Sequence, residues 1–437
     1  MTSISPTPSF TELTRVFARI GCLSFGGPAG QIALMHRELV DELKWINEEQ
    51  YLSALNFCHL LPGPEAQQLA TWIGWRLHGV KGGLVAGMLF VIPGALVILA
   101  LSVLYSYAAN LGWFAALFLG IKAAVLAIVV QALIRIGGRA LNTSFKQSIA
   151  VVAFTALFFF NLPFPFVVLG AVMIGIWVAP RRPDWLALKT SNAPALDDAR
   201  PWAATLWAVL VWLGIWATPM AAVYVTLGPD HVLWQIGSFF SQLAIVTFGG
   251  AYAVLSYMAQ EAVQGFGWLS PGEMADGLGL AETTPGPLIM VTQFVGYLAA
   301  FRTPEPFSPL VAGIVGAVLT TWVTFAPCFL WIFALAPWIE RLENARWLKG
   351  GLSTLTAAVV GVIANLAIWF ALHVIFSKVG ERQFGLLRLY WPETESFVWQ
   401  AGLLTGVSAL LIFRFKWNVI KSLAAAGLGG ILLGQIS

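Results

Sequence analysis

The sequence predicts an all-α integral membrane protein made of two repeats, for three reasons. Of its 437 residues, 58% are hydrophobic and only 10% are charged, which is too little polar surface to face water on all sides. Several apolar runs approach the roughly 20 residues that span a bilayer. Two Gly- and Pro-containing motifs recur at one constant spacing. Because lipid offers the backbone no hydrogen-bond partners, the spanning segments are expected to be helices.

The repeat is visible in two motifs. Phe-Gly-Gly at 25–27 recurs at 248–250, and Pro-Gly-Pro at 62–64 recurs at 285–287, so both shifts are 223 residues (248 − 25 and 285 − 62). Identical residues between the motifs align without a gap: Met35, Glu38, Val40, Trp45 and Leu55 with Met258, Glu261, Val263, Trp268 and Leu278. One unit has therefore been duplicated. A duplicated apolar unit that is interrupted by Gly and Pro is typical of secondary transporters.

The chain is expected to divide into a first transmembrane repeat at 1–180, a second at 228–437, and a cytoplasmic linker plus one inverting helix at 181–227. Pro and Asp residues interrupt the apolar sequence within 181–200. Apolar spans are predicted at 82–108, 111–134, 147–160, 164–179, 202–227, 307–335, 351–376, 397–413 and 417–435.

Basic residues orient the spans, because Lys and Arg near span ends prefer the cytoplasmic side. Arg139 and Lys146 place one turn of the first half inside, whereas Arg414 and Lys416 place the opposite end of the matching hairpin inside. The span at 202–227 has no counterpart and would turn the second copy over. This pattern predicts inverted-topology repeats with a cytoplasmic N-terminus. The loop at 378–395 would then be external despite its three basic residues. The length of the chain and the general character of its sequence suggest that the protein lies in a bacterial inner membrane.

Each motif is expected to break a helix, giving broken or re-entrant helices. Glycine has no Cβ, and proline removes a backbone donor and clashes with the preceding turn. Broken backbone at membrane depth survives only next to protein or a water-filled cavity, and a new helix start presents N–H groups that suit an oxyanion. A single such motif is more often a kink or a close packing contact. Its paired recurrence favours a binding site.

Side chains near the breaks complete the predicted substrate site. Lys122 is added because it is the only charged residue in the run 82–134, although snorkelling toward the interface is the alternative. The predicted substrate-binding residues are Gly26, Gly27, Pro62, Gly63, Pro64, Gln67, Gln68, Lys122, Gly249, Gly250, Thr283, Thr284, Pro285, Gly286, Pro287 and Gln293.

Proton coupling is predicted at His59, Glu65, Glu261 and Glu282, since ionisable groups in apolar surroundings are costly and tend to be functional or paired. His59 and Glu282 occupy the same repeat position (282 − 223 = 59). The alternative for His59 is a hydrogen bond to a neighbouring carbonyl. Glu38 matches Glu261, but its charged neighbours favour a solvated or salt-bridged carboxylate.

Several functions are excluded by composition. A net charge of +3 gives no reason to expect nucleic acid, and the three cysteines and five scattered histidines give no metal site. No phosphate-binding loop with Lys-Ser or Lys-Thr is present, so the chain is not expected to hydrolyse ATP, to need a cofactor or to be an enzyme. The lipid bilayer and a small oxyanion are the expected partners, and a homodimer is left open.

Together these motifs resemble the chromate ion transporter family, in its long two-domain form, over nearly the whole chain. The residues that carry the resemblance include 23–29, 61–64, Trp45 and Pro93 in the first half, and 248–252, 284–287, Trp268, 294–297 and Pro327 in the second. The resemblance implies gradient-driven export of chromate and chromate resistance. Ala251 departs from it, because the first copy has Pro28 there. A transporter for sulfate or another small anion remains the alternative, and a channel is a third.

Overall fold

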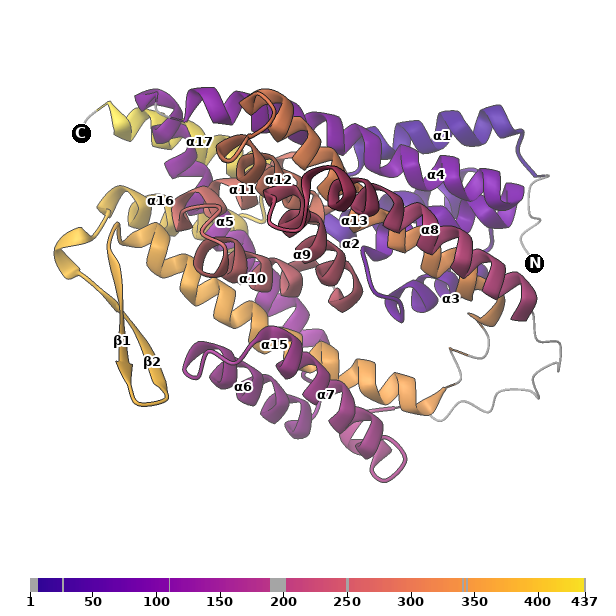
Figure 1. Cartoon of the computed structure of the whole chain (residues 1–437). Helices are drawn as coiled ribbons and strands as arrows, with labels where there is room; N and C mark the ends of the chain where they lie inside the picture. Colours follow the sequence, from indigo (N-terminus) through magenta and orange to yellow (C-terminus); the bar gives the residue numbers. More distant parts are fainter. Residues whose placement is uncertain are drawn as a thin grey trace. The chain divides into compact units, whose positions relative to one another are not determined.

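The computed structural model describes residues 7–25, 27–109, 111–188, 202–248, 251–339, 342 and 345–435. As predicted, these residues are mostly helical (Figure 1). They divide into two compact units, and each unit takes segments from both halves of the sequence. Unit 1 comprises Met1–Val103, Ser191–Ala251 and Thr284–Ala345. Unit 2 comprises Leu104–Thr190, Tyr252–Thr283 and Arg346–Ser437.

Unit 1 contains a set of short helices and three long ones. Capping side chains start the short helices: Ser9 Oγ accepts the N–H of Glu12, and Asn47 and Gln50 form a capping box. The elements are α1 (Phe10–Leu23), α2 (Gly27–His36), η1 (Arg37–Glu42), α3 (Glu48–His59), α4 (Glu65–Ala108, mostly in unit 1), α8 (Trp202–Leu227), α9 (Val232–Val246), η4 (Leu288–Met290), α12 (Val291–Arg302), α13 (Pro309–Leu335) and η5 (Ala336–Trp338).

The three long helices of unit 1, α4, α8 and α13, each carry an internal proline, which in α8 is Pro219. Helix α4 has 44 residues, with Pro93 inside and non-helical backbone at His78 and Gly79, so the expected span at 82–108 forms its second part. Helix α13 contains Pro327 and packs against α8, α9 and α12. The core of this unit joins side chains of α1, α3, α4 and α13, including Phe17, Phe57 and Phe90.

Unit 2 is organised around α15, which packs against α5, α6 and α7. Glycines permit close helix contact, since a Cβ at Gly361 would overlap the carbonyl oxygen of Ala150 on α6. The elements are α5 (Gly112–Ala140), α6 (Ser144–Phe158), α7 (Phe164–Val178), η2 (Pro183–Leu186), α10 (Ala251–Gln260, in unit 2 from Tyr252), η3 (Glu261–Gly265), α11 (Pro271–Thr283), α15 (Arg346–Ile375), β1 (Val379–Phe384), β2 (Leu387–Pro392), η6 (Thr394–Ser396), α16 (Trp399–Ala409), η7 (Leu410–Arg414) and α17 (Val419–Gly434).

A β-hairpin corrects the all-α prediction. Strands β1 and β2 pair antiparallel, with Gly380 opposite Trp391 and Gln383 opposite Arg388, and they appear as two arrows in Figure 1. They occupy most of the loop at 378–395. Outside the apolar runs, composition does not require helix, and β-branched and aromatic residues such as Val379, Tyr390 and Trp391 favour strands.

Five helices of the described residues are long and apolar enough to cross a membrane, namely α4, α5, α8, the segment Pro309–Trp338 and α15. The chain is therefore a multi-pass membrane protein. Four other expected spans form helices of fewer than 18 residues: α6 and α7 have 15 residues each, α16 has 11 and α17 has 16. Helices α7, α16 and α17 are shorter than predicted, whereas α6 is one residue longer than the expected 147–160. Fifteen residues of helix measure about 22 Å, less than the hydrocarbon thickness of about 30 Å. Expected and observed bounds of 202–227 agree.

Candidate functional site

The motifs separate helices, as the sequence predicts. The first Phe-Gly-Gly lies between α1 and α2, the first Pro-Gly-Pro between α3 and α4, and the second Pro-Gly-Pro between α11 and η4. Helix α9 ends at Val246, just before the second Phe-Gly-Gly. The predicted site residues Gly26, Gly249 and Gly250 lie outside the described residues.

Two crossed hydrogen bonds connect the halves within unit 1. The N–H of Gly63 donates to the carbonyl oxygen of Thr247 at 2.7 Å, and the N–H of Gly286 donates to that of Ser24 at 2.8 Å. The repeat shift exchanges these two bonds, because 286 − 63 and 247 − 24 are both 223. Each Pro-Gly-Pro turn is thus held by the residue that precedes the Phe-Gly-Gly of the other half.

Both turns require glycine at their centre. Gly63 has a φ of +117° and Gly286 a φ of +91°, a region that side chains with a Cβ rarely adopt. A Cβ at Gly63 would lie 2.8 Å from Cys328 Sγ, and one at Gly286 would lie 3.3 Å from Gly94 Cα. Cys328 and Gly94 each follow the internal proline of a long helix. Each turn therefore packs against the proline-containing helix of the other half.

A small pocket joins the broken segments. Its walls come from α2, both Pro-Gly-Pro turns, the first turn of α4 and η4. It has about 280 Å³ of empty space, its mouth included, but only about 10 Å³ for the centre of a water-sized sphere. That is room for about one water molecule, so a tetrahedral oxyanion needs the walls to move apart. The lining residues are Pro28, Gln31, Pro64, Glu65, Ala66, Thr247, Pro287, Leu288 and Ile289.

Helix α4 gives this pocket its electrostatic character. It begins at Glu65, directly after the first Pro-Gly-Pro turn, and the N–H of Gln68 is bonded to the carbonyl oxygen of Pro64. The N–H groups of the preceding residues in the first turn have no acceptor within the helix. Together with the positive end of the helix dipole, they make this wall of the pocket suitable for an anion.

Three buried glutamines support the turns. Gln31 Nε2 donates to the carbonyl oxygen of Gly286 at 2.6 Å, and Gln68 Nε2 donates to that of Pro62 at 2.6 Å. Gln67 Nε2 donates to Thr71 Oγ1 at 3.1 Å. Gln31 Nε2 also donates to the carbonyl oxygen of Ser24 at 3.4 Å. The Oε1 atoms of all three glutamines have no partner among the described residues. Polar groups thus remain for a ligand. Gln31 is absent from the predicted substrate-binding residues. Its only indication in the sequence is its position shortly after the first Phe-Gly-Gly motif.

The other predicted site residues of unit 1 lie in different environments. Glu65 lines the pocket, whereas His59 is exposed at the end of α3. Thr284 is buried beside the second turn. Gln293 is also buried: its Nε2 donates to the carbonyl oxygen of Ala95 at 2.9 Å, and its Oε1 accepts from Thr321 Oγ1 at 3.0 Å. Gln293 therefore connects α12 with α4 and α13.

In unit 2, Lys122 meets a carboxylate that the sequence analysis did not consider. Its Nζ on α5 lies 3.1 Å from Asp276 Oδ1 on α11, and Tyr105 Oη donates to Asp276 Oδ2 at 2.7 Å. Asp276 is only 6% exposed. A single sequence shows no link between residues this far apart in the chain. The result is a buried ion pair in an apolar helical unit.

The remaining coupling candidates lie on η3 and α11. Glu261 is half-buried at the start of the π-helix η3, and Glu282 is buried near the end of α11. Thr283 Oγ1 donates to the carbonyl oxygen of Leu280 at 2.8 Å. In unit 1, Glu38 lies in the matching π-helix η1 and forms an ion pair with Arg19. The expectation of a salt-bridged Glu38 is confirmed.

Long apolar helices, a duplicated sequence and broken helices around a polar pocket define this protein as a membrane transporter rather than an enzyme. The family model described as chromate transporter matches residues 11–176 and 234–431, one segment in each half. The chain therefore belongs to the chromate transporter family.

Curated relatives cover most of the chain. It is 32% identical to the chromate transport protein of Pseudomonas aeruginosa, over 99% of this chain and 94% of that protein. It is 29% identical to the chromate transport protein of Cupriavidus metallidurans, over 84% of each chain. The probable chromate transport protein of Synechococcus elongatus is 28% identical, over 84% of this chain and 85% of that protein. No solved structure matches the chain.

Proposed function

We propose that this protein is a secondary active transporter that exports chromate from the cytoplasm and so gives chromate resistance. The observation that carries the proposal is the pair of crossed hydrogen bonds, which brings both Pro-Gly-Pro turns to one pocket at the start of α4. Family membership and the names of the relatives supply chromate as the substrate. Sulfate or another small anion is the alternative, because sulfate is also a tetrahedral dianion.

Substrate binding in this proposal uses backbone and amide donors. The N–H groups in the first turn of α4 replace part of the water around the anion. Gln31 lines the pocket and can exchange its long bond to Ser24 for one to the anion. The glycines of the broken segments allow the backbone to approach closely. Because Lys122 meets Asp276, we assign that pair to coupling and not to direct contact with the substrate.

Coupling to protons follows from the position of Glu65. Its carboxylate lines the pocket at the first residue of α4, where it competes with a dianion for the same positive helix end. A proton on Glu65 removes this competition. Proton occupancy and anion occupancy of this pocket are then thermodynamically linked. His59, Glu261 and Glu282 are the further proton carriers that we propose.

We further propose that residues 1–180 and 228–437 are inverted-topology repeats, joined by 181–227, in the inner membrane with a cytoplasmic N-terminus. Two features support this arrangement: the basic residues at the span ends, and the exchange of the two crossed hydrogen bonds under the repeat shift. Alternating access would then be a rocking of the repeats about the pocket, which also provides the opening that a tetrahedral anion needs.

Transport of radiolabelled chromate into inverted membrane vesicles tests the proposal. With an imposed pH gradient, vesicles that contain the protein are expected to accumulate chromate above the external concentration, and vesicles without it are not. Flux that stays passive would indicate a channel. Stronger inhibition by unlabelled sulfate than by unlabelled chromate would favour the sulfate alternative.

Replacing Glu65 with glutamine is expected to make chromate binding independent of protonation at this position. The variant keeps the size of the side chain but removes the negative charge from the pocket, so it should bind chromate at neutral pH severalfold more tightly than the wild type. Uphill accumulation driven by a pH gradient should fall at least about tenfold, because the proposed link is lost. Equilibrium binding and vesicle transport measure the two effects.

Glu49→Gln is the matched control, since Glu49 is an exposed acid in the first turn of α3. It should leave both quantities within about twofold of the wild type, as surface substitutions do. Normal gradient-driven accumulation by Glu65→Gln would remove Glu65 from the coupling mechanism.

A further inference from the structure

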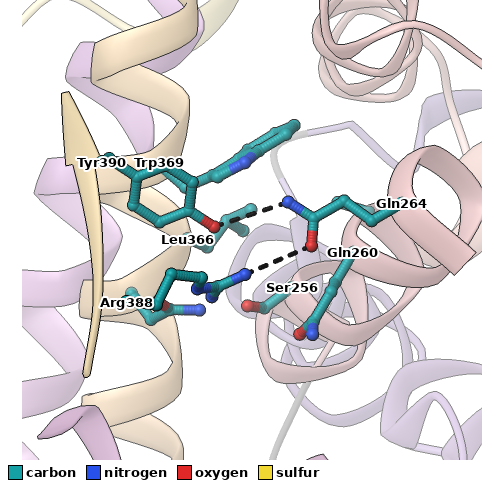
Figure 2. Close-up of a pocket in the computed structure, with 9 residues that line it drawn as sticks. Ser256, Gln260, Gln264, Leu366, Trp369, Arg388 and Tyr390 are labelled. Carbon is teal, nitrogen blue, oxygen red and sulfur yellow. Dashed lines mark hydrogen bonds between the residues drawn. The ribbon is translucent and has the colours of Figure 1, made fainter. Parts of the chain in front are cut away.

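A second polar pocket lies in unit 2, at the β-hairpin. Its walls come from α10, η3, α15 and β2, and its polar lining includes Ser256, Gln260, Gln264 and Tyr390 (Figure 2). Arg388 is the only charged residue among the described residues that line it. No function described above uses this pocket.

Arg388 is buried, with an exposed fraction of 5%, although it lies on a hairpin strand. Its backbone N–H donates to the carbonyl oxygen of Phe159 at 2.7 Å, which fixes β2 against the end of α6. Its guanidinium makes two long hydrogen bonds of 3.4 Å, from Nη1 to Gln264 Oε1 and from Nη2 to the carbonyl oxygen of Leu157. Figure 2 shows the contact with Gln264. Its Nε has no partner among the described residues.

The charge of Arg388 is poorly balanced by the protein. Its ion pair with Glu381 spans 3.8 Å, and the Glu381 side chain is 42% exposed. A typical N–H···O bond measures 2.7–3.2 Å, and a buried cation is costly unless it is both paired and hydrogen-bonded. The guanidinium lies over the Tyr390 ring, 4.8 Å from its centroid, and this cation–π contact offsets part of the charge. Its Nε–H still has no acceptor among the described residues, and its carboxylate partner is distant and exposed.

The rest of the pocket offers donors without negative charge. Ser256 carries a hydroxyl, and Gln260 keeps one amide N–H beyond its bond to Asn161 Oδ1. The Gln264 amide already donates to Glu381 Oε1 at 3.0 Å and to Tyr390 Oη at 3.5 Å. Burial raises the pKa of the Tyr390 phenol, so this hydroxyl stays protonated. Arginine surrounded by amides and hydroxyls is a common arrangement for recognising oxygen anions.

We propose that the Arg388 pocket binds one oxygen-bearing end of a small oxyanion. The pocket leaves about 10 Å³ for the centre of a water-sized sphere, so one oxygen enters it and the rest of the anion stays at the mouth. A free tetrahedral anion and the phosphate of a lipid headgroup share this chemistry. The proposal is independent of the anion that the protein transports, because none of the broken-helix residues of unit 1 takes part.

A cysteine placed in the pocket gives a local test. We would introduce Ser256→Cys in a Cys22→Ser background, since Cys58 and Cys328 are buried and Cys22 is the exposed cysteine. The rate of modification by a small neutral methanethiosulfonate is measured on the purified full chain, with and without sulfate. Sulfate is expected to slow the reaction severalfold. Binding elsewhere in the protein does not shield this thiol directly.

Variants of Arg388 then test whether its guanidinium binds the anion. Adding Arg388→Gln should weaken protection by sulfate at least about tenfold, the loss expected for charge-assisted hydrogen bonds. Arg382→Gln removes the same charge from the exposed face of the same hairpin and should change protection by less than about twofold. If Arg388→Gln does not elute as a folded species, Arg388→Lys replaces it. That variant keeps the charge but loses the planar donor fork, so its protection should also be weaker.

Two arms separate the sources of the anion. Protection by sulfate in lipid-free detergent indicates a free anion, whereas protection in nanodiscs of phosphatidylglycerol but not of zwitterionic phosphatidylcholine indicates the phosphate of an anionic lipid headgroup. Either result supports the proposal. Absence of protection in both arms, or equal protection with Arg388 replaced, overturns it. Chromate transport into vesicles is measured in parallel, so a failure here is distinguishable from a failure of the proposed function.

Discussion

Gly63→Val is expected to lower chromate transport at least about tenfold while the protein still inserts into the membrane. The backbone at Gly63 has a φ of +117°, and a Cβ there would lie 2.8 Å from Cys328 Sγ. A valine must therefore change the backbone, at a cost of about 1–3 kcal/mol, and displace α13 or the turn. Either movement disturbs the hydrogen bond from Gly63 to Thr247 and the pocket beside it. Vesicle transport and membrane-fraction immunoblots measure the two outcomes.

Gly228→Val separates backbone strain from damage to the site. Gly228 also has a positive φ, +84°, but a Cβ there meets nothing within 4 Å. It should insert and transport within about threefold of the wild type, because strain in an open turn is tolerated. Gly286→Val is expected to resemble Gly63→Val, since Gly286 occupies the equivalent turn. Normal transport by both turn variants would remove the Pro-Gly-Pro segments from the mechanism.

Breaking the Lys122–Asp276 pair should have the second large effect. Lys122→Gln leaves the buried Asp276 carboxylate without its cation, and removing one partner of a buried ion pair typically costs about 3–5 kcal/mol. We expect a lower unfolding temperature in detergent and little uphill transport. Asp276→Asn should behave similarly, because Lys122 then loses its carboxylate.

The double variant Lys122→Gln with Asp276→Asn distinguishes stability from coupling. With both charges gone, the unfolding temperature should recover most of the loss, because no unpaired charge remains. Uphill transport should stay at least about tenfold reduced if the pair takes part in coupling. Lys421→Gln, at an exposed position of α17, serves as the charge-matched control. Full recovery of both stability and uphill transport would make the pair purely structural.

The sequence predicted the breaks well, because their causes are local. Gly and Pro restrict the backbone at their own positions, so residues 62–64 and 285–287 separate helices whatever surrounds them. What joins the turns was not predictable. The partner of Gly63 is Thr247, far away in the chain, and no local pattern specifies that contact.

The features that the sequence analysis did not predict have similar physical causes. Lys122 was recognised as an isolated cation, but its partner Asp276 lies on another helix, and only the fold brings the two together. The hairpin at β1 and β2 was missed because apolar composition predicts helix only where lipid surrounds the backbone. Helix lengths differed for a related reason: an apolar run such as 147–160 shows burial, but it does not show where a helix must end.

Because of the crossed backbone hydrogen bonds, the Pro-Gly-Pro turn of each copy depends on a carbonyl acceptor from the other copy. Main-chain bonds of this kind constrain shape and leave side chains free to diverge. The shift of 223 places Val254 opposite Gln31 and Leu288 opposite Glu65, so the two copies share these backbone bonds while the second copy lacks both polar groups. The backbone therefore keeps the symmetry of the duplication, whereas the side chains that line the pocket differ between the two copies.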